Sequence, residues 1–188
     1  MNNRENLLDR ALEAFSLRGY EAVGVQEIAA AAGITKPTLY YYFGSKSGLL
    51  ATLFEERFAP FLAELTQTAA YAHDVTKGLE QIARAHFAFA QHTPHLYRLY
   101  LSLTLAPVES EPFRVTRGYR LRQADLMEAF FAEAARDHGN MKGRQQAYAA
   151  SFIGLLNTYI TLALNGQATV DDQLIYKVVH QFMHGIFS

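Results

Sequence analysis

The sequence predicts an all-α protein of about nine helices: a three-helix head followed by a larger helical body. Apolar residues recur at intervals of three and four along most of the chain, which is the period of a helix with one buried face. No segment shows the apolar–polar alternation that predicts a strand. Half of the 188 residues are apolar and 19% are charged, so the chain can build a sizeable core and disorder is excluded.

The predicted helices begin and end at recognisable residues. Gly19 ends the first, Pro107 ends the sixth and Gly166 follows the eighth, since glycine and proline interrupt a helix. In chain order we expect helices at residues 4–18, 24–33, 36–43, 46–72, 75–91, 95–106, 113–137, 142–164 and 171–187, with a loop at 108–113.

Residues 30–50 carry the most informative pattern. An alanine-rich helix ends at Gly33, which suits a left-handed C-terminal cap. Thr35 can cap a two-turn helix that has Pro37 in its first turn. Gly44 stops that helix and Ser45 can cap the next. Two helices joined by a short glycine-containing turn predict a helix-turn-helix.

The two-turn helix predicts an unusual surface. Leu39 and Phe43 lie four residues apart and can face a small core with Leu8, Phe15 and Ile28. The side chains left outward are Lys36, Thr38, Tyr41 and Tyr42. A DNA groove suits such a surface, because hydroxyls reach phosphates and aromatic rings lie against sugars and thymine methyls. Core or dimer packing of the tyrosines is the alternative.

Pro60 lies inside the long predicted helix at 46–72. Because proline removes one backbone hydrogen bond, we expect a kink near Glu56 or Arg57; the alternative is that Pro60 ends the helix. This helix joins head to body, so an interruption here bears on how motion passes between them.

Charge and cysteine content set limits on function. Net charge is −1, and residues 1–50 hold five basic and five acidic side chains, so a DNA-binding role depends on where the cations lie. With no cysteine there is neither a disulfide nor a thiolate metal site, which fits a cytoplasmic protein. The N-terminus lacks the apolar run of a signal peptide, and no apolar run approaches the about 18 residues of a membrane span.

The head resembles the DNA-binding module of the TetR family of bacterial transcriptional regulators over roughly residues 4–55. The residues that carry the resemblance are Gly19-Tyr20, Ile28-Ala29, Ala32-Gly33-Ile34, Thr38 to Phe43, Lys46 and Leu49-Leu50. It implies a DNA-binding domain at residues 1–50 and a ligand-binding and dimerisation domain at 51–188. Because C-terminal halves in this family diverge with their ligands, the resemblance does not extend recognisably further.

Residue roles carry over by position. The resemblance implies that Gln26 and Tyr41 contact base edges, that Thr38, Tyr42 and Lys46 contact phosphates, and that Lys36 can do either. We expect Tyr40 to be partly structural, packing its ring and offering its hydroxyl to the backbone. Two departures shift the expected operator: Gly24-Val25 stands where the family often has Thr or Ser, and Tyr42 where His is frequent.

Ligand and dimer residues are expected in the body. Aromatic and polar side chains that can line a pocket for an apolar or aromatic effector are Phe87, Tyr97, Tyr100, Tyr119, Arg120, Tyr148, Phe152 and Asn157. Core packing explains most of them equally well, and Arg98, Arg117 and Arg120 leave room for an anionic effector. The last two predicted helices are apolar on more than one face, which predicts a two-fold four-helix bundle with a second copy. The expected interface residues are Phe152, Leu156, Tyr159, Ile160, Ile175, Val179, Phe182, Met183 and Ile186.

Catalytic and metal motifs are missing from the sequence. It has no Gly-x-Ser-x-Gly elbow, phosphate loop or His-Glu-x-x-His pattern, so we expect neither an enzyme nor a cofactor. His180 and His184 are four apart, but two histidines without a placed carboxylate favour packing over metal binding.

The expected function is a homodimeric transcriptional regulator, a repressor that binds a palindromic operator in double-stranded DNA and is released by a small-molecule effector. One alternative is a DNA-binding accessory or activating protein that needs no ligand. The other is an all-α binding protein or enzyme whose tyrosine-rich helix is a protein interface.

Overall fold

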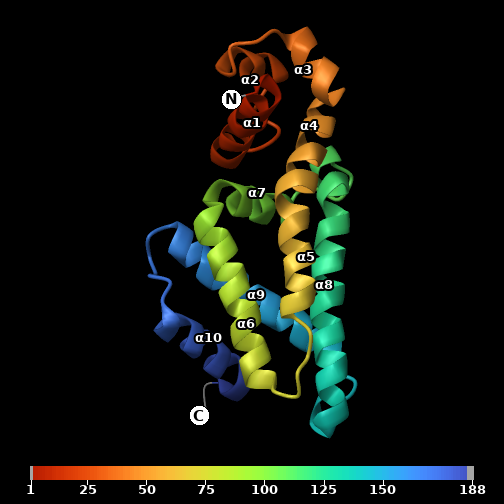
Figure 1. The fold of residues 1–188 in the computed structure, drawn as a ribbon, viewed down its shortest axis with the longest axis vertical. Helices are drawn as coiled ribbons and strands as arrows, with labels where there is room; N and C mark the ends of the chain where they lie inside the picture. Colours follow the sequence, from red (N-terminus) through yellow and green to blue (C-terminus); the bar gives the residue numbers. More distant parts are fainter. Residues whose placement is uncertain (1, 186–188) are drawn as a thin grey trace. The chain divides into compact units, whose positions relative to one another are not determined.

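The computed structural model describes residues 2–185, and it is all-α over that range (Figure 1). The helices are α1 Asn3–Arg18, α2 Val25–Ala31, α3 Lys36–Phe43, α4 Lys46–Leu53, α5 Ala59–Thr68, α6 Val75–His92, α7 Pro94–Thr104, α8 Glu111–Asp137, α9 Gln145–Leu164 and α10 Asp172–His184. A π-helical turn, Phe54–Phe58, joins α4 to α5 without a break. The described residues thus form nine α-helical runs and no strand, as predicted, together with a short 3₁₀ turn at Gly139–Met141.

The chain forms two compact units. Unit 1 comprises Met1–Pro60 and His95–Arg120, and unit 2 comprises Phe61–Pro94 and Leu121–Ser188. The chain therefore passes between units after Pro60, after Pro94 and within α8 after Arg120. The predicted boundary between residues 50 and 51 falls inside α4, and as a division of function it stays a prediction.

The helix-turn-helix forms through the expected caps. Thr35 Oγ1 accepts a hydrogen bond from the Thr38 N–H (3.4 Å), and Ser45 Oγ accepts one from the Gly48 N–H (2.9 Å). Gly33 and Gly44 adopt φ angles of 69° and 70°, a left-handed conformation that costs glycine little. Gly24 caps α2 without a side-chain hydrogen bond, as its lack of a side chain predicts.

The core of unit 1 joins the three head helices to α4. Leu8, Phe15, Ile28, Leu39 and Phe43 are all buried, as predicted. A core of this size is marginal alone, and α1 also packs against α4. Two ion-pair groups add to this contact: Arg4 pairs with Glu56, and Arg57 pairs with Glu5 at 3.0 Å and Asp9 at 2.6 Å.

Gly48 fixes how closely α3 and α4 approach each other. A Cβ built at Gly48 would lie 2.0 Å from the carbonyl oxygen of Phe43, so no other residue fits without moving the backbone. The turn between the two helices is thus held by a close approach as well as by caps.

Pro60 interrupts the long helix without ending it. In the π-helical turn just before Pro60, the Ala59 N–H bonds to the carbonyl of Phe54, five residues earlier in the chain. The helix then continues to Thr68. A wider turn is one way a helix accommodates the backbone donor that proline lacks. The turn covers Glu56 and Arg57, where the interruption was predicted, but the helical run stops at Thr68 rather than near residue 72.

Four other predicted boundaries were wrong by two or three residues. α2 ends at Ala31 rather than at residue 33, and α7 ends at Thr104 rather than at residue 106. α8 begins at Glu111, because Ser110 Oγ accepts from the Phe113 N–H (3.4 Å) and Pro112 sits in the first turn, where proline is tolerated. α9 begins at Gln145 rather than 142, since Gly143 adopts a φ of 80°. α10 ends at His184, and the predicted extension to 187 lies outside the described residues.

In unit 2, α6 packs against both α9 and α10. Its buried stripe includes Leu79, Ile82 and Phe87, and Asp74 Oδ1 caps its start by accepting from the Lys77 N–H (2.9 Å). A Cβ at Gly78 would lie 2.6 Å from the Phe130 ring, so glycine lets α6 and α8 approach each other.

Most of the expected dimer stripe is buried within the chain, so those side chains are not at its surface. The residues that bury against the chain's own helices are Phe152, Leu156, Ile160, Ile175 and Val179. Since α9 is apolar on every face, its sequence cannot indicate which face turns inward. Tyr159 and Phe182 are half-buried and Met183 is exposed, while Ile186 lies outside the described residues.

α9 is also long and apolar enough to cross a membrane, by length and composition only. Ser151, Asn157 and Thr158 interrupt its apolar residues, so a single helix of this kind is weak evidence of a membrane span. Core helices of soluble proteins pass the same test, but only 22% of its most apolar 18-residue window is buried in this chain.

Candidate nucleic-acid interface and ligand pocket

The exposed side of α3 carries the predicted DNA-binding side chains. Leu39 and Phe43 point into the core, while Tyr41 is 84% exposed and its ring meets the Tyr42 ring edge-on at 5.4 Å. Thr38 is half-buried, with Oγ1 2.9 Å from Thr35 Oγ1. α2 packs against α3 and presents an exposed Gln26.

The cations of the head divide into two classes. Four arginines in residues 2–60 pair with carboxylates: Arg4 with Glu56, Arg10 with Glu13, Arg18 with Glu27, and Arg57 with Glu5 and Asp9. Lys36 and Lys46 form no ion pair within the part of the chain that is described. The two cations of this segment that form no ion pair thus lie at the start of α3 and the start of α4.

Lys46 is more enclosed than a typical phosphate-binding lysine. Its ammonium lies 4.1 Å from the centre of the Tyr20 ring and 5.8 Å from that of Phe15. Burial lowers the pKa of Lys46, while the nearby carboxylates of Glu21 and Glu111 act to raise it. A cation over an aromatic face is held in place, and Tyr20 is itself fixed by donating a hydrogen bond from its hydroxyl to Glu111 (2.7 Å).

Tyr40 and Lys36 form a pair on the other side of α3. Tyr40 is 40% exposed, and the Lys36 ammonium lies 5.5 Å from its ring centre. The expectation that the Tyr40 hydroxyl bonds to the backbone was wrong, since no such bond occurs among the described residues. The structural part of the Tyr40 prediction is therefore limited to its half-exposed ring beside Lys36.

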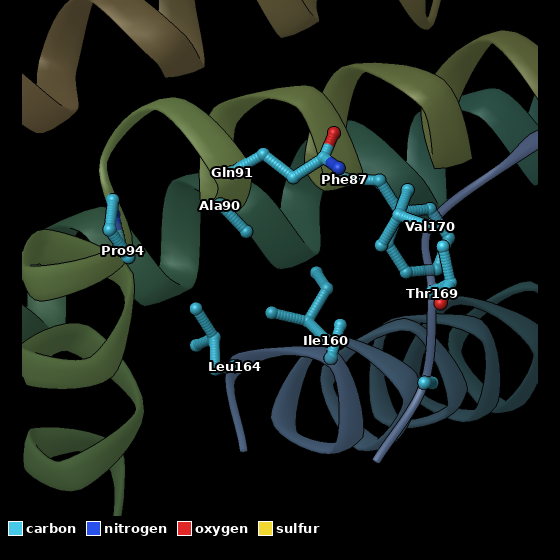
Figure 2. A pocket seen from close by; sticks show the side chains of 10 residues that line it. Phe87, Ala90, Gln91, Pro94, Ile160, Leu164, Thr169 and Val170 are labelled. Atoms are coloured by element: carbon cyan, nitrogen blue, oxygen red, sulfur yellow. The ribbon is translucent and has the colours of Figure 1, made fainter. Parts of the chain in front are cut away.

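Unit 2 contains a surface pocket of about 520 Å³ between α6, α9 and the segment that follows α9. Figure 2 shows Phe87 and Ala90 of α6 facing Ile160 and Leu164 of α9 across it, with the Gln91 amide beside α6. The remaining lining residues are Pro94, Ala163, Ala168, Thr169 and Val170. Eight of the ten lining residues are apolar, although much of the surface that the pocket exposes is polar, and the volume lies in the range of small-molecule sites.

The eight predicted ligand residues fall into several groups, and only Phe87 lines this pocket. Tyr97, Tyr100, Tyr119 and Arg120 belong to unit 1. In unit 2, Tyr148 and Phe152 contact the ring of Phe182 (6.3 and 4.9 Å between ring centres) in an aromatic cluster, and Asn157 is half-buried on α9. Their aromatic character did not distinguish pocket from core.

The aromatic group of unit 1 is tightly enclosed. Tyr97 and Tyr100 are buried, which raises the pKa of both phenols. The ring of Tyr100 packs 4.5 Å from that of Phe58, in the π-helical turn. Burial and a hydrogen bond donated to Glu55 raise the pKa of Tyr119 to about 12.

A buried polar pair was not anticipated in unit 2. His86 Nδ1 lies 2.8 Å from the Ile82 carbonyl, which can only accept, so Nδ1 carries the proton. Nε2 then accepts from Gln123 Nε2 (2.8 Å). Burial lowers the pKa of His86 to about 4, so this imidazole is neutral at pH 7. The two residues are 37 positions apart, so no local pattern could have paired them.

No sequence pattern identified most of the residues that line the pocket. Ala90, Ala163, Leu164 and Ala168 are small or aliphatic residues that any helix packing uses. The structure also places His180 and His184 with ring centres 4.6 Å apart on α10. Within residues 2–185 no group of three or more His, Asp or Glu side chains could hold a metal ion.

Comparisons with known proteins agree with this geometry. The family described as "Bacterial regulatory proteins, tetR family" matches residues 7–53. The HTH-type transcriptional activator FasR of Mycolicibacterium smegmatis is 28% identical over 98% of this chain and 83% of its own length. The fatty acid metabolism regulator protein of Bacillus subtilis is 28% identical over 44% of this chain and 42% of its own length.

A solved structure is similar over nearly the whole chain. FadR from Bacillus subtilis, in complex with stearoyl-CoA, superposes with a TM-score of 0.79 at 20% identity, covering 97% of this chain and 98% of that one. At this identity the likeness shows the fold.

Fold, helix-turn-helix surface and relatives together define an all-α, DNA-binding transcriptional regulator. Residues 7–53 match the DNA-binding module of the TetR family of bacterial transcriptional regulators, and over nearly its whole length the chain is similar to a regulator of that kind. Its relatives are regulators and not enzymes.

Proposed function

We propose that this regulator reads a two-fold symmetric operator as a homodimer, placing α3 of each copy in the major groove. The observation that carries the proposal is the pairing pattern of the head. Among the described residues Lys36 and Lys46 have no carboxylate within ion-pair distance, and Tyr41 on the same helix as Lys36 is 84% exposed. In this proposal Tyr41 and Gln26 contact base edges. Thr38, Tyr42 and Lys46 contact phosphates. Lys36 contacts either a base or a phosphate, and Tyr40 supports Lys36.

The test is selection of binding sites from random duplex DNA with the purified protein. A palindromic site whose affinity falls steeply with salt supports the proposal. If folded protein enriches no site, both before and after refolding away from any bound ligand, the head does not read DNA and α3 is better explained as a protein interface.

The dimer surface that we propose is the outward face of α9 with the adjoining part of α10. α9 has no charged residue, and most of its surface is uncovered within one chain. Monomers rarely expose an apolar face of this extent, and a two-fold partner covers it with the same surface. Leu155, Thr158 and Leu162 of α9, with Tyr176 and Met183 of α10, are the side chains available for this contact.

A charge placed on that surface tests the dimer. Thr158→Arg puts a cation at an exposed position of α9 and should yield monomers by analytical ultracentrifugation, since a buried charge without a partner is costly. Gln67→Arg, exposed on α5, is the matched control and should stay dimeric. Two dimeric variants would place the interface elsewhere.

We propose further that the effector carries a long acyl chain. FadR of Bacillus subtilis was solved with stearoyl-CoA, and two relatives are named as regulators of fatty acid metabolism or degradation. Most side chains that line the pocket between α6 and α9 are apolar and suit such a chain. We also propose that residues 1–50 bind DNA, that residues 51–188 bind the effector and form the dimer, and that the protein is cytoplasmic.

The proposed mechanism is a shift between two conformations of the dimer. Two recognition helices must reach successive major grooves, about 34–36 Å apart. An effector that prefers another spacing lowers DNA affinity by its differential affinity for the two states. The π-helical turn before Pro60, where the chain passes between units, is the proposed lever. Equal head-to-head distances in the effector-bound and operator-bound dimers, with DNA still released, would contradict it.

The proposed sign of regulation is repression. An activator is the second candidate, because FasR, whose match covers 98% of this chain, is named as one. A reporter gene behind the selected operator separates them: a repressor lowers its expression and releases it when stearoyl-CoA accumulates, whereas an activator raises it.

A further inference from the structure

Arg120 of α8 makes contacts within unit 1 that do not include an ion pair. Its guanidinium lies 4.0 Å from the centre of the Phe113 ring, and Nη1 donates a long hydrogen bond of 3.4 Å to the Thr104 carbonyl. Nε is buried and makes no hydrogen bond. An arginine placed only to pack would leave its donors in water or pair them.

No carboxylate comes within ion-pair distance of Arg120 among the described residues. Elsewhere in unit 1, Arg4 and Arg57 are half-buried and each has a carboxylate partner. A buried donor of a charged group that stays unpaired costs free energy, and such exceptions call for an explanation. The planar guanidinium fork is also the side chain best suited to bind carboxylate or phosphate oxygens through two parallel hydrogen bonds.

The surroundings of Arg120 are aromatic. The preceding residue, Tyr119, packs its ring 5.5 Å from that of Phe54, and Tyr100 lies near enough for the cation to act on its phenol. Tyr100 in turn packs against Phe58. One unpaired cation beside buried rings suits a ligand that joins an anionic group to an apolar body.

We propose that Arg120 is a specificity-determining residue that binds the anionic group of the effector, a carboxylate or a phosphate. This inference rests on the proposed function for the acyl-chain part of the ligand. It goes beyond it in assigning the charge selectivity to one residue of this chain.

The experiment measures the affinity of the full-length protein for stearate, stearoyl-CoA and methyl stearate. They share a chain and differ in whether a carboxylate, phosphates or no anion is present. The variants are Arg120→Gln and Arg120→Lys, with Arg117→Gln, an exposed arginine one turn earlier on α8, as the matched control. Release from the selected operator is recorded separately for each ligand.

We expect Arg120→Gln to weaken binding of an anionic ligand by about 10- to 100-fold, to spare methyl stearate, and to be partly rescued in Arg120→Lys. A loss confined to stearate identifies the carboxylate as the bound group, and a loss confined to stearoyl-CoA identifies the phosphates. Arg117→Gln should match wild type. Equal affinities for wild type and Arg120→Gln, or wild type that binds neither anion, overturn the assignment.

The two proposals fail in different ways. If methyl stearate releases DNA while Arg120→Gln changes nothing, the effector function stands and the anion site does not. If anion binding depends on Arg120 but no ligand releases DNA, the anion site stands and the effector function fails.

A stability measurement separates binding from a merely structural role. Arg120→Met keeps contact with the Phe113 ring and removes the unpaired donor, so its melting temperature without ligand should equal or exceed that of wild type. A lowered melting temperature would show that Arg120 serves the fold and would overturn the proposal.

Discussion

The head of unit 1 and the α6–α9 region of unit 2 are both helical, but their candidate binding sites are built in different ways. In the head, Thr35, Gly44 and Ser45 fix the turn, and function depends on a few exposed side chains at fixed spacing. In unit 2 the pocket is a shape formed by residues such as Ala90 and Ala163, none of which is distinctive alone. Local chemistry can therefore be read from a short stretch, whereas a pocket depends on how distant helices pack.

The strongest test of this contrast compares two glycines. Gly48→Ala in the head should destabilise the protein by about 3 kcal/mol or more, because the new Cβ meets a backbone carbonyl at 2.0 Å. Gly78→Ala in unit 2 should cost only about 1–2 kcal/mol, since the Phe130 ring that it meets can shift. Urea unfolding gives both values.

Gly118→Ala is the control for helix propensity. A Cβ there meets nothing within 4 Å, so the substitution should stabilise α8 by about 0.5–1 kcal/mol. Equal costs at Gly48 and Gly78 would show that the head tolerates backbone movement as readily as unit 2 tolerates ring movement.

The buried His86 makes the folding stability of the protein depend on pH. Its pKa falls from 6.5 to about 4 on folding, so the unfolded chain binds the proton more readily. Stability is fully present above pH 6.5 and falls by about 3 kcal/mol as the pH drops to 4. Denaturant midpoints measured between pH 6.5 and 4 should fall less steeply for His86→Gln than for wild type. Parallel curves of stability against pH for the two proteins would contradict the assignment.

Operator binding distinguishes side chains within the head. Tyr41→Ala should cost about 1–3 kcal/mol and relax preference at one base position. Lys46→Ala should weaken all sequences alike and reduce the salt slope by about one. Arg10→Ala is the control, since its charge is paired with Glu13 away from these lysines. Uniform losses for both test variants would mean that Tyr41 does not read bases.

The smallest expected effect concerns the cap of α3. Thr35→Ala removes the acceptor for the Thr38 N–H and should cost about 1 kcal/mol. Thr35→Ser retains a hydroxyl and should restore most of it. A loss of operator affinity larger than the loss of stability would show that Thr35 positions Thr38, whose Oγ1 it also contacts.

The sequence by itself determined the helical class, the caps of α3 and α4, the inward Leu39 and Phe43 and the outward Tyr41. These follow from periodicity and from hydrogen bonds that span three or four residues, so the local chain contains the whole signal. The interruption at Pro60 was predictable for the same reason, though its form, a π-helical turn, was not.

Tertiary structure decided what depends on distant partners. Packing determined which face of α9 is buried, and Phe152 and Leu156 lie on that face. A helix with apolar residues on more than one face does not itself indicate which face is buried. Packing also paired His86 with Gln123, joined Arg4 to Glu56 and left Arg120 without a carboxylate. Charges and polar groups are satisfied or left unsatisfied only by what packing brings beside them, and the residues concerned can lie dozens of positions apart.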